Sequence, residues 1–333
     1  MTTLQVTYFQ RKRRISSYSL EFVFENLRHL LNGHVQPRVR IAPFLSNGLF
    51  RRLAIMLDAK LHEGMINHVT GDINFACILL RSKRTVLTIL DVGDAHSRHG
   101  IRGVLLRAIW YRLPSHRCAI VTTISEASKQ DIVQITGCKP EKVVVIPIGV
   151  SEIFTNCPER DRNAAPRILQ VGTSPNKNLK RVVAALRSIE CTLVIIGELD
   201  ADQRDYLRRS EIRYENHVSL TTEELFAEYC NASLVVFASL YEGFGMPIVE
   251  AQSVGRAVIT SDTSSMPEVA GKGACFVDPT SVDSIRHAIL KVLNDDRYRG
   301  ELVRQGLINV ARFDARQVAR EYLAIYEKIA KNQ

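Results

Sequence analysis

Short β-branched runs alternate with helix-length amphipathic stretches along the whole chain. This alternation is typical of parallel sheets covered by helices. The first half is predicted to contain strands at Leu4–Phe9, Val35–Ile41, Met65–Val69, Arg84–Leu90, Ala119–Ile124 and Lys142–Ile146. The second half is predicted to contain strands at Arg167–Val171, Thr192–Ile196, Val218–Leu220, Leu234–Ala238, Ala257–Thr260 and Ala274–Val277. Each half is therefore interpreted as an α/β domain with a doubly wound, Rossmann-like sheet.

The periodic pattern is lost between residues 151 and 166, where two prolines and several charges are typical of a linker. A chain of 333 residues also exceeds the size at which one hydrophobic core stops growing. We therefore predict an N-terminal domain at 1–160, a C-terminal domain at 161–314, and a final helix at 315–333 that packs back onto the first domain. Because open α/β sheets bind ligands at the carboxyl ends of their strands, we expect the two domains to face each other across a substrate cleft.

Basic charge is concentrated in the first half of the chain. Residues 1–165 contain 23 Lys and Arg against 13 Asp and Glu, a net charge of +10, whereas the remainder has 21 against 22. This positive charge could attract an anionic lipid leaflet or a phosphorylated acceptor. The alternative is that the basic residues form a solvated surface without a partner. Nucleic acid is not an expected partner, because no helix-turn-helix, zinc finger or RNP pattern is present.

The seven cysteines are scattered singly, without a CxxC pair or metal-ligand spacing, and we expect all of them to be reduced. No segment approaches the ~20 apolar residues of a membrane span. The N-terminus places a short apolar stretch before the basic Arg11–Arg14 cluster, the reverse of a secretory signal. These features predict a cytoplasmic protein, with a peripheral position on the inner face of the cytoplasmic membrane as an extension of that interpretation.

The most informative segment is SLVVFASLYEGFGMPIVEAQ, in which an apolar strand leads into Glu242–Gly245 and then into a helix with Pro247 in its first turn. The two glycines, Gly243 and Gly245, allow close approach of the backbone to a ligand. Free amides at a helix N-terminus, here those of Phe244, Gly245 and Met246, attract phosphate.

Two glutamates bracket this predicted anion site. Glu250 lies about one turn into the helix, where it could accept hydrogen bonds from ribose hydroxyls, and Glu242 could reach hydroxyls beyond the phosphates. The alternative is an ordinary strand-to-helix turn with two solvated carboxylates. The arrangement resembles the E-x7-E motif of retaining glycosyltransferases, and the second half as a whole is similar to glycosyltransferase family 4, which has the GT-B fold.

The segment VGTSPNKNLKRVVAAL, residues 171–186, resembles the part of this family in which a lysine meets the diphosphate. The resemblance places that lysine at Lys177, although the arginine that many members carry a few residues earlier is missing. KVVVIPIGVSEIF, TISEASKQDI and SSMPEVAGKGACFVDP are further similar segments, so that the resemblance covers about residues 65–330. The candidate donor-binding residues are Gly172, Thr173, Lys177, Asn178, Glu242, Gly243, Phe244, Gly245, Met246 and Glu250, with Glu242 and Lys177 as the catalytic candidates.

The chain departs from the family where a histidine usually precedes an aspartate, because Leu90 stands there before Asp91. That histidine is expected to contact the transferred sugar in the family. Asp91, His68 and His96 are therefore candidates for sugar or acceptor contacts, although each histidine has a structural or surface role as its alternative.

The resemblance implies a retaining, metal-independent hexosyltransferase, such as a mannosyltransferase, with a nucleoside diphosphate sugar as co-substrate and no cofactor. Its acceptor would be a glycan or a lipid-linked molecule in cell-surface polysaccharide assembly. A nicotinamide-dependent oxidoreductase is disfavoured, because Gly243 and Gly245 lack the third glycine of the dinucleotide fingerprint. A catalytically weak or inactive nucleotide-sugar-binding protein with a basic membrane- or polyanion-binding domain remains the alternative, because the histidine is lost.

Overall fold

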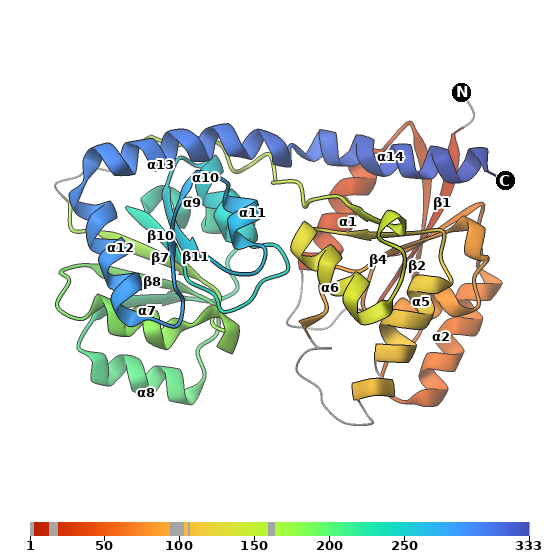
Figure 1. Cartoon of the computed structure of the whole chain (residues 1–333), viewed down its shortest axis with the longest axis horizontal. Helices are drawn as coiled ribbons and strands as arrows, with labels where there is room; N and C mark the ends of the chain where they lie inside the picture. The colour runs from red at the N-terminus through yellow and green to blue at the C-terminus, as the bar shows by residue number, and fades with distance from the viewer. Residues whose placement is uncertain (1–2, 13–18, 94–102, 106, 159–163, 333) are drawn as a thin grey trace. The chain divides into compact units, whose positions relative to one another are not determined.

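The computed structural model describes residues 3–12, 19–93, 103–105, 107–158 and 164–332. The chain divides into two compact units (Figure 1). The first comprises Met1–Gly149 together with Ala315–Gln333, and the second comprises Val150–Asp314. Each unit contains one six-stranded sheet and the helices that cover it, which confirms the predicted α/β class.

The sheet of the first unit is parallel throughout and has the order β2-β1-β3-β4-β5-β6. Its strands are β1 Leu4–Gln10, β2 Val35–Ile41, β3 Ile66–Val69, β4 Thr85–Thr88, β5 Ile120–Thr123 and β6 Val143–Val145. Its helices are α1 Ser19–Leu30, α2 Leu49–Leu61, α5 Leu113–His116, α6 Glu126–Thr136 and α14 Ala315–Lys331. Shorter helical turns are η1 Asn74–Ile78, η2 Ser82–Arg84, the π-helical η3 Arg107–Arg112, and η4 Pro140–Lys142.

The last helix of the chain, α14, completes the core of the first unit. Its apolar positions recur every three or four residues, so that one face of the helix is buried. Tyr322 and Tyr326 on this face pack in one cluster with Phe24 of α1 and Tyr8 of β1. Residues at the two ends of the sequence thus share one core.

The second unit also has a parallel sheet, in the order β12-β11-β10-β7-β8-β9. Its strands are β7 Arg167–Val171, β8 Thr192–Ile196, β9 Arg213–His217, β10 Leu234–Phe237, β11 Ala257–Ser261 and β12 Ala274–Val277. Its helices are α7 Leu179–Leu186, α8 Ala201–Ser210, α9 Thr222–Asn231, α10 Met246–Ser253, α11 Met266–Ala270, α12 Val282–Asn294 and α13 Asp296–Asn309, with turns η5 Pro175–Lys177 and η6 Val310–Phe313. The strand order reverses between β7 and β10, which is the point where doubly wound sheets bind ligands.

One predicted strand is wrong. Val218–Leu220 lies outside the sheet, and the strand is instead β9, Arg213–His217, immediately before it. This strand pairs only with β8 at the sheet edge and is partly exposed, so its residues are polar and lack the β-branched run of a buried strand. Arg167 of β7 holds it by hydrogen bonds of 2.6 and 2.9 Å to the carboxylate of Glu215.

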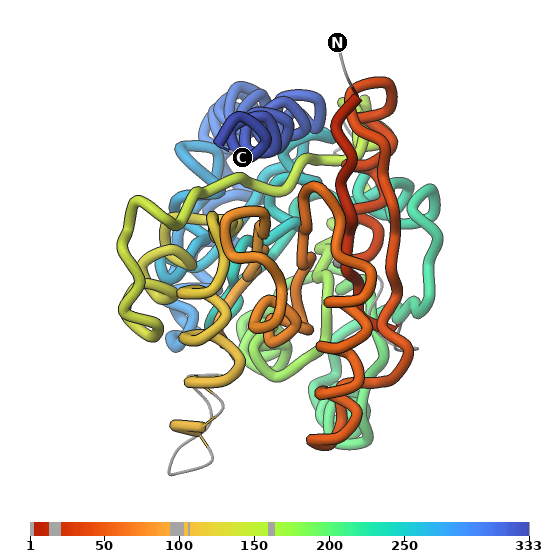
Figure 2. Tube along the Cα trace, turned by 90° about the vertical axis from the view of Figure 1, so that its right-hand side faces the viewer, coloured from red at the N-terminus to blue at the C-terminus, as the bar shows by residue number. Residues whose placement is uncertain are grey.

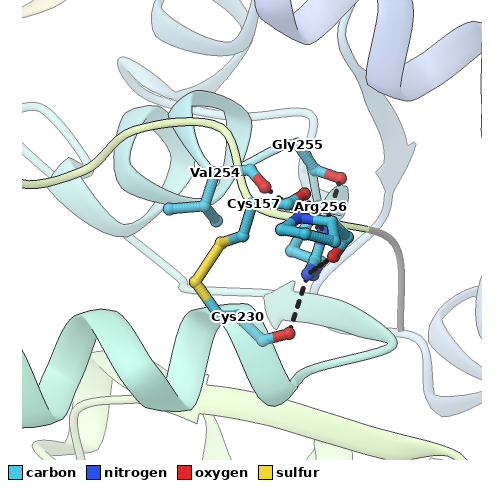
Figure 3. The surroundings of a disulfide bond; sticks show 6 residues. Cys157, Cys230, Val254, Gly255 and Arg256 are labelled. Carbon is cyan, nitrogen blue, oxygen red and sulfur yellow. Dashed lines mark hydrogen bonds between the residues drawn. A yellow bond between two sulfur atoms is a disulfide. The ribbon is translucent and has the colours of Figure 1, made fainter. Parts of the chain in front are cut away.

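The expectation that all cysteines are reduced is also wrong for one pair. Cys157 and Cys230 form a disulfide with a Cα–Cα distance of 6.0 Å, which ties the chain before β7 to the end of α9 (Figure 3). Arg256 reinforces the junction, because its guanidinium donates to the carbonyl oxygen of Cys230 at 2.7 Å. The pairing joins residues 73 positions apart, a separation that leaves no mark in the sequence. The other cysteines are buried thiols: Cys77, Cys118, Cys138, Cys191 and Cys275.

Among the described residues, no helix combines the length and the apolar character that crossing a bilayer requires.

Candidate active site

The site begins at the carboxyl end of β7, where Gly172 leaves space for a lysine. Gly172 has φ +95°, and a Cβ added to it would lie 2.9 Å from Cε of Lys177. The short turn η5 then brings Lys177 back across this glycine, with its ammonium 4.5 Å from the ring centre of Phe237 on β10. A glycine is therefore required here by both the backbone and the lysine.

The ammonium of Lys177 forms an ion pair with Glu242. Nζ lies 2.6 Å from Oε1, and the two side chains are only 19% and 13% exposed. Asn176 donates to the same carboxylate oxygen at 3.2 Å and to the carbonyl oxygen of Tyr241 at 3.1 Å. The two catalytic candidates are thus in contact, at the point where the strand order reverses.

Two serines fix the backbone of the loop after β10. Ser265 donates to the carbonyl oxygens of Glu242 and Phe244 at 2.8 and 2.9 Å. The amide of Glu242 donates to Oγ of Ser264 at 3.2 Å, and the Ser264 hydroxyl donates in turn to the Glu242 carbonyl oxygen. The loop is therefore held in one conformation before any ligand arrives.

The loop ends at the N-terminus of α10. Gly245 precedes the helix with φ +105°, and Pro247 lies in the first turn, as predicted. No described residue accepts a hydrogen bond from the amides of Phe244, Gly245 or Met246. Unsatisfied amides at a helix N-terminus carry partial positive charge, and here they follow Glu242, the partner of Lys177, in the same loop. This part of the site is suited to an anion.

Glu250 lies on α10 and receives a hydrogen bond of 2.6 Å from the hydroxyl of Tyr229 on α9. Burial raises the pKa of Glu250 to about 7, against the opposing effects of the Tyr229 hydrogen bond and the charge of Lys177. Glu250 as a whole residue is partly exposed.

The remaining predicted donor-binding residues have structural contacts. Asn178 is buried with φ +62°, and its amide nitrogen donates to the carbonyl oxygens of Ala238 and Pro279. The hydroxyl of Thr173 donates to the carbonyl oxygen of Glu198 at 2.6 Å. Gly243 is buried within the serine-held loop. In this conformation Asn178 and Thr173 act by shaping the turn around Lys177.

The three candidates in the first unit have different environments. His68 on β3 is fully buried, with its ring nitrogens 2.7 Å from the hydroxyls of Tyr326 and Thr88. Burial lowers the pKa of His68 to about 3, so the ring is a neutral part of the core. Asp91 is exposed beyond β4, and its Oδ1 accepts a hydrogen bond from the amide of Gly93. His96 lies outside the described residues.

Sequence reasoning missed four residues that build the site. Asn176 and Tyr229 are hydrogen-bonded to the two glutamates, and Ser264 and Ser265 hold the loop between them. The serines stand in SSMPEVAGKGACFVDP, a segment singled out for its resemblance, which was the available signal. Asn176 and Tyr229 carried no pattern of their own. Among the described residues, no group of three or more His, Cys, Asp or Glu side chains could hold a metal ion.

Comparison with known proteins places this site in a family. Residues 159–307 match the family model for glycosyl transferases group 1. The matched segment lies within the second unit. The predicted similarity to a glycosyltransferase family is confirmed for this segment. The segment contains all of the donor-binding candidates, from Gly172 to Glu250.

Similarity to relatives and solved structures reaches beyond this segment. The chain is 26% identical to O-antigen chain mannosyltransferase B of Escherichia coli over 277 residues, which are 74% of this chain and 71% of that one. It is 31% identical to MMP alpha-(1->4)-mannosyltransferase of Mycolicibacterium hassiacum over 223 residues, 62% of this chain and 53% of the relative. Anabaena HepE, solved in complex with UDP and glucose, has a TM-score of 0.78 at 15% identity, with coverage of 97% and 99%. The GT-B fold expected from the resemblance is confirmed.

Proposed function

We propose that the protein is a retaining hexosyltransferase that moves a sugar from a nucleoside diphosphate sugar to an acceptor hydroxyl. The observation that carries this proposal is the contact between Lys177 and Glu242, beside the amides of Phe244–Met246. It places a cation, a set of amide donors and a carboxylate at one point of a group 1 domain. The cation and the amide donors can bind the diphosphate of a nucleoside diphosphate sugar, and the carboxylate can accept hydrogen bonds from hydroxyls of the sugar.

The donor would lie along the carboxyl ends of β7 and β10. Its diphosphate would bind Lys177 and the amides of Phe244–Met246, and its ribose hydroxyls would donate to Glu250. A diphosphate oxygen would compete with Glu242 for the Lys177 ammonium, because the two are ion-paired at 2.6 Å without the donor. Glu242 would then be released to orient hydroxyls of the sugar.

Transfer breaks the bond between the anomeric carbon and the diphosphate and forms a bond to the acceptor oxygen on the same face, while the proton of the acceptor hydroxyl passes to the departing diphosphate. Negative charge develops on the departing diphosphate. Once the donor has displaced Glu242, Lys177 and the helix N-terminal amides would face that charge, so they would stabilise the transition state without further reorganisation. In this proposal they supply the positive charge, and the reaction uses no metal ion or cofactor.

The acceptor belongs, in this proposal, to polysaccharide or glycolipid assembly, with mannose as the first sugar to test. Support comes from the two relatives named as mannosyltransferases, one of them acting on an O-antigen chain by its name. The net charge of +10 in residues 1–165 favours an anionic or lipid-linked acceptor and a peripheral position at an anionic membrane surface.

A thermal-shift screen of nucleoside diphosphates and their sugars tests the donor, because a ligand that binds only the folded state raises its stability. The expected result is stabilisation by one nucleotide family, followed by release of nucleoside diphosphate when acceptor is added. Stabilisation without release against a broad acceptor panel would favour the inactive sugar-nucleotide-binding protein, which the leucine before Asp91 keeps as the second candidate. No stabilisation by any nucleotide would overturn both.

A further inference from the structure

Helix α2 of the first unit turns an apolar face outward. The helix spans Leu49–Leu61, and its buried residues are Ile55 and Ala59. The exposed large apolar residues are Leu49, Phe50, Leu53, Leu57 and Leu61, with exposures of 75%, 86%, 49%, 51% and 82%. We call these five residues the α2 stripe. A helix on a soluble surface normally carries polar residues at such positions.

The α2 stripe is continuous along the helix. Leu49, Leu53, Leu57 and Leu61 are each four residues apart, and Phe50 lies between them in angle. At ~100° per residue the five side chains occupy an arc of about 120°, and this arc is centred well away from Ile55 and Ala59. In Figure 2, α2 runs along the outside of the strands of its unit. The helix therefore has one face for the core and a second apolar face without a described partner.

Neighbouring segments enlarge this surface. Phe44 and Leu45, just before α2, are also exposed. The guanidinium of Arg52 lies 4.7 Å from the ring centre of Trp110, which brings the segment around η3 against α2. Val104, Leu105 and Leu113, in and beside that segment, are exposed as well. An exposed apolar surface such as the α2 stripe is a mark of an interaction site.

The charge around the α2 stripe selects the partner. Residues 36–65 contain five Lys and Arg but only two acidic residues, Asp58 and Glu63. Both acids are already paired, Asp58 with Arg40 and Glu63 with Lys60. Residues 103–117 add three arginines and no acid. A second copy of the chain would bring two positive surfaces together, whereas an anionic lipid surface complements both the charge and the apolar side chains.

We propose that the α2 stripe docks on an anionic lipid bilayer. Phe50, Leu53 and Leu57 enter the boundary between head groups and acyl chains, and Lys60, an exposed residue within the same arc of α2, meets the head groups. The biological role of this docking rests on the proposed function, since docking would bring the enzyme to a lipid-linked acceptor. The binding itself involves no catalysis, so it is tested separately from sugar transfer.

The experiment is vesicle flotation of the full chain with phosphatidylcholine vesicles, with and without phosphatidylglycerol. We expect binding to the anionic vesicles that weakens at high salt, and much less binding to neutral ones. The double substitution Phe50→Ser with Leu57→Ser should weaken binding by roughly tenfold or more, because two apolar side chains no longer leave water. Lys60→Gln should weaken it less and reduce the salt dependence.

Matched controls lie on the second unit, where Ile308 on α13 is 59% exposed and Arg208 on α8 is also exposed. Ile308→Ser and Arg208→Gln should leave flotation unchanged. All variants should keep the wild-type shift in melting temperature with nucleotide, which separates lost docking from lost donor binding. Equal flotation of wild type and the double variant would overturn the proposal. So would a dimer in solution that Phe50→Ser with Leu57→Ser converts to monomer while vesicles bind neither form.

Discussion

Nζ of Lys177 lies 2.6 Å from Oε1 of Glu242, although the two residues are 65 positions apart. The contact depends on the switch in strand order, which brings the carboxyl ends of β7 and β10 next to each other. Each residue therefore has a measurable effect on the other, and the predictions below begin with this pair.

Lys177→Ala and Glu242→Gln should each slow sugar transfer on the order of 10²-fold or more, because each removes a group aimed at the reacting part of the donor. The double variant should be about as slow as the worse single one, since the two residues act as a unit. Transfer and donor hydrolysis would both be measured. Lys180→Ala is the matched control, because Lys180 is an exposed lysine on the next helix that pairs with Asp202. Unchanged rates in both single variants would remove the assignment.

Gly172→Ala should weaken nucleotide-sugar binding by displacing Lys177. The added Cβ would stand 2.9 Å from Cε of the lysine, so the side chain must move. Gly137→Ala is the control: its φ of +65° is also left-handed, but a Cβ there meets nothing within 4 Å. Both variants should lose about 1 kcal/mol of folding stability from backbone strain, and only Gly172→Ala should lose affinity. Titration calorimetry and thermal melts give the two quantities.

Glu250 should make the free energy of unfolding fall between pH 4.5 and about 7. Its folded-state pKa of about 7 lies above the ordinary pKa of 4.5, so the folded protein holds this proton more tightly than the unfolded chain does. The contribution is present below pH 4.5 and is lost as the pH rises through 7, by up to about 3 kcal/mol. The free energy of unfolding, measured with denaturant across this pH range, should fall in wild type and should lack this fall in Glu250→Gln. The exposed control Glu223→Gln should show the same pH dependence as wild type. Parallel curves for wild type and Glu250→Gln would contradict the raised pKa.

Removing the disulfide between Cys157 and Cys230 should lower the free energy of unfolding by roughly 2–4 kcal/mol, because the bond closes a long loop in the unfolded chain. Reductant should destabilise wild type and have no further effect on Cys157→Ser with Cys230→Ser. The protein unfolded without reductant should react as five thiols. Seven reactive thiols would show that the bond does not form.

The core strands were the most predictable part of this fold. Buried strands such as β7 and β8 have the predicted bounds because both of their faces need apolar residues. The edge strand β9 was missed, since half-exposed residues such as Asn216 carry no such constraint. The disulfide was missed for a different reason: it depends on which loops meet in space, and single cysteines do not encode that.

The site divides in the same way. The turn from Glu242 to Met246 could be predicted because its glycines, its proline and the spacing of the two glutamates all lie within one short segment of the sequence. Tyr229 was not, because it reaches Glu250 from another helix. His68 stood out as a candidate by residue type alone, and the fold places it against Tyr326 in the core.

The return of α14 to the first unit sets an order of assembly on the ribosome. The second unit is one unbroken stretch, Val150–Asp314, so it can close as soon as it leaves the exit tunnel. The first unit, although its synthesis begins earlier, must wait for Tyr322 and Tyr326, which are made only after the whole of the second unit. A nascent chain therefore holds an unsealed N-terminal sheet until α14 emerges, so the unit whose synthesis starts first is the later one to close.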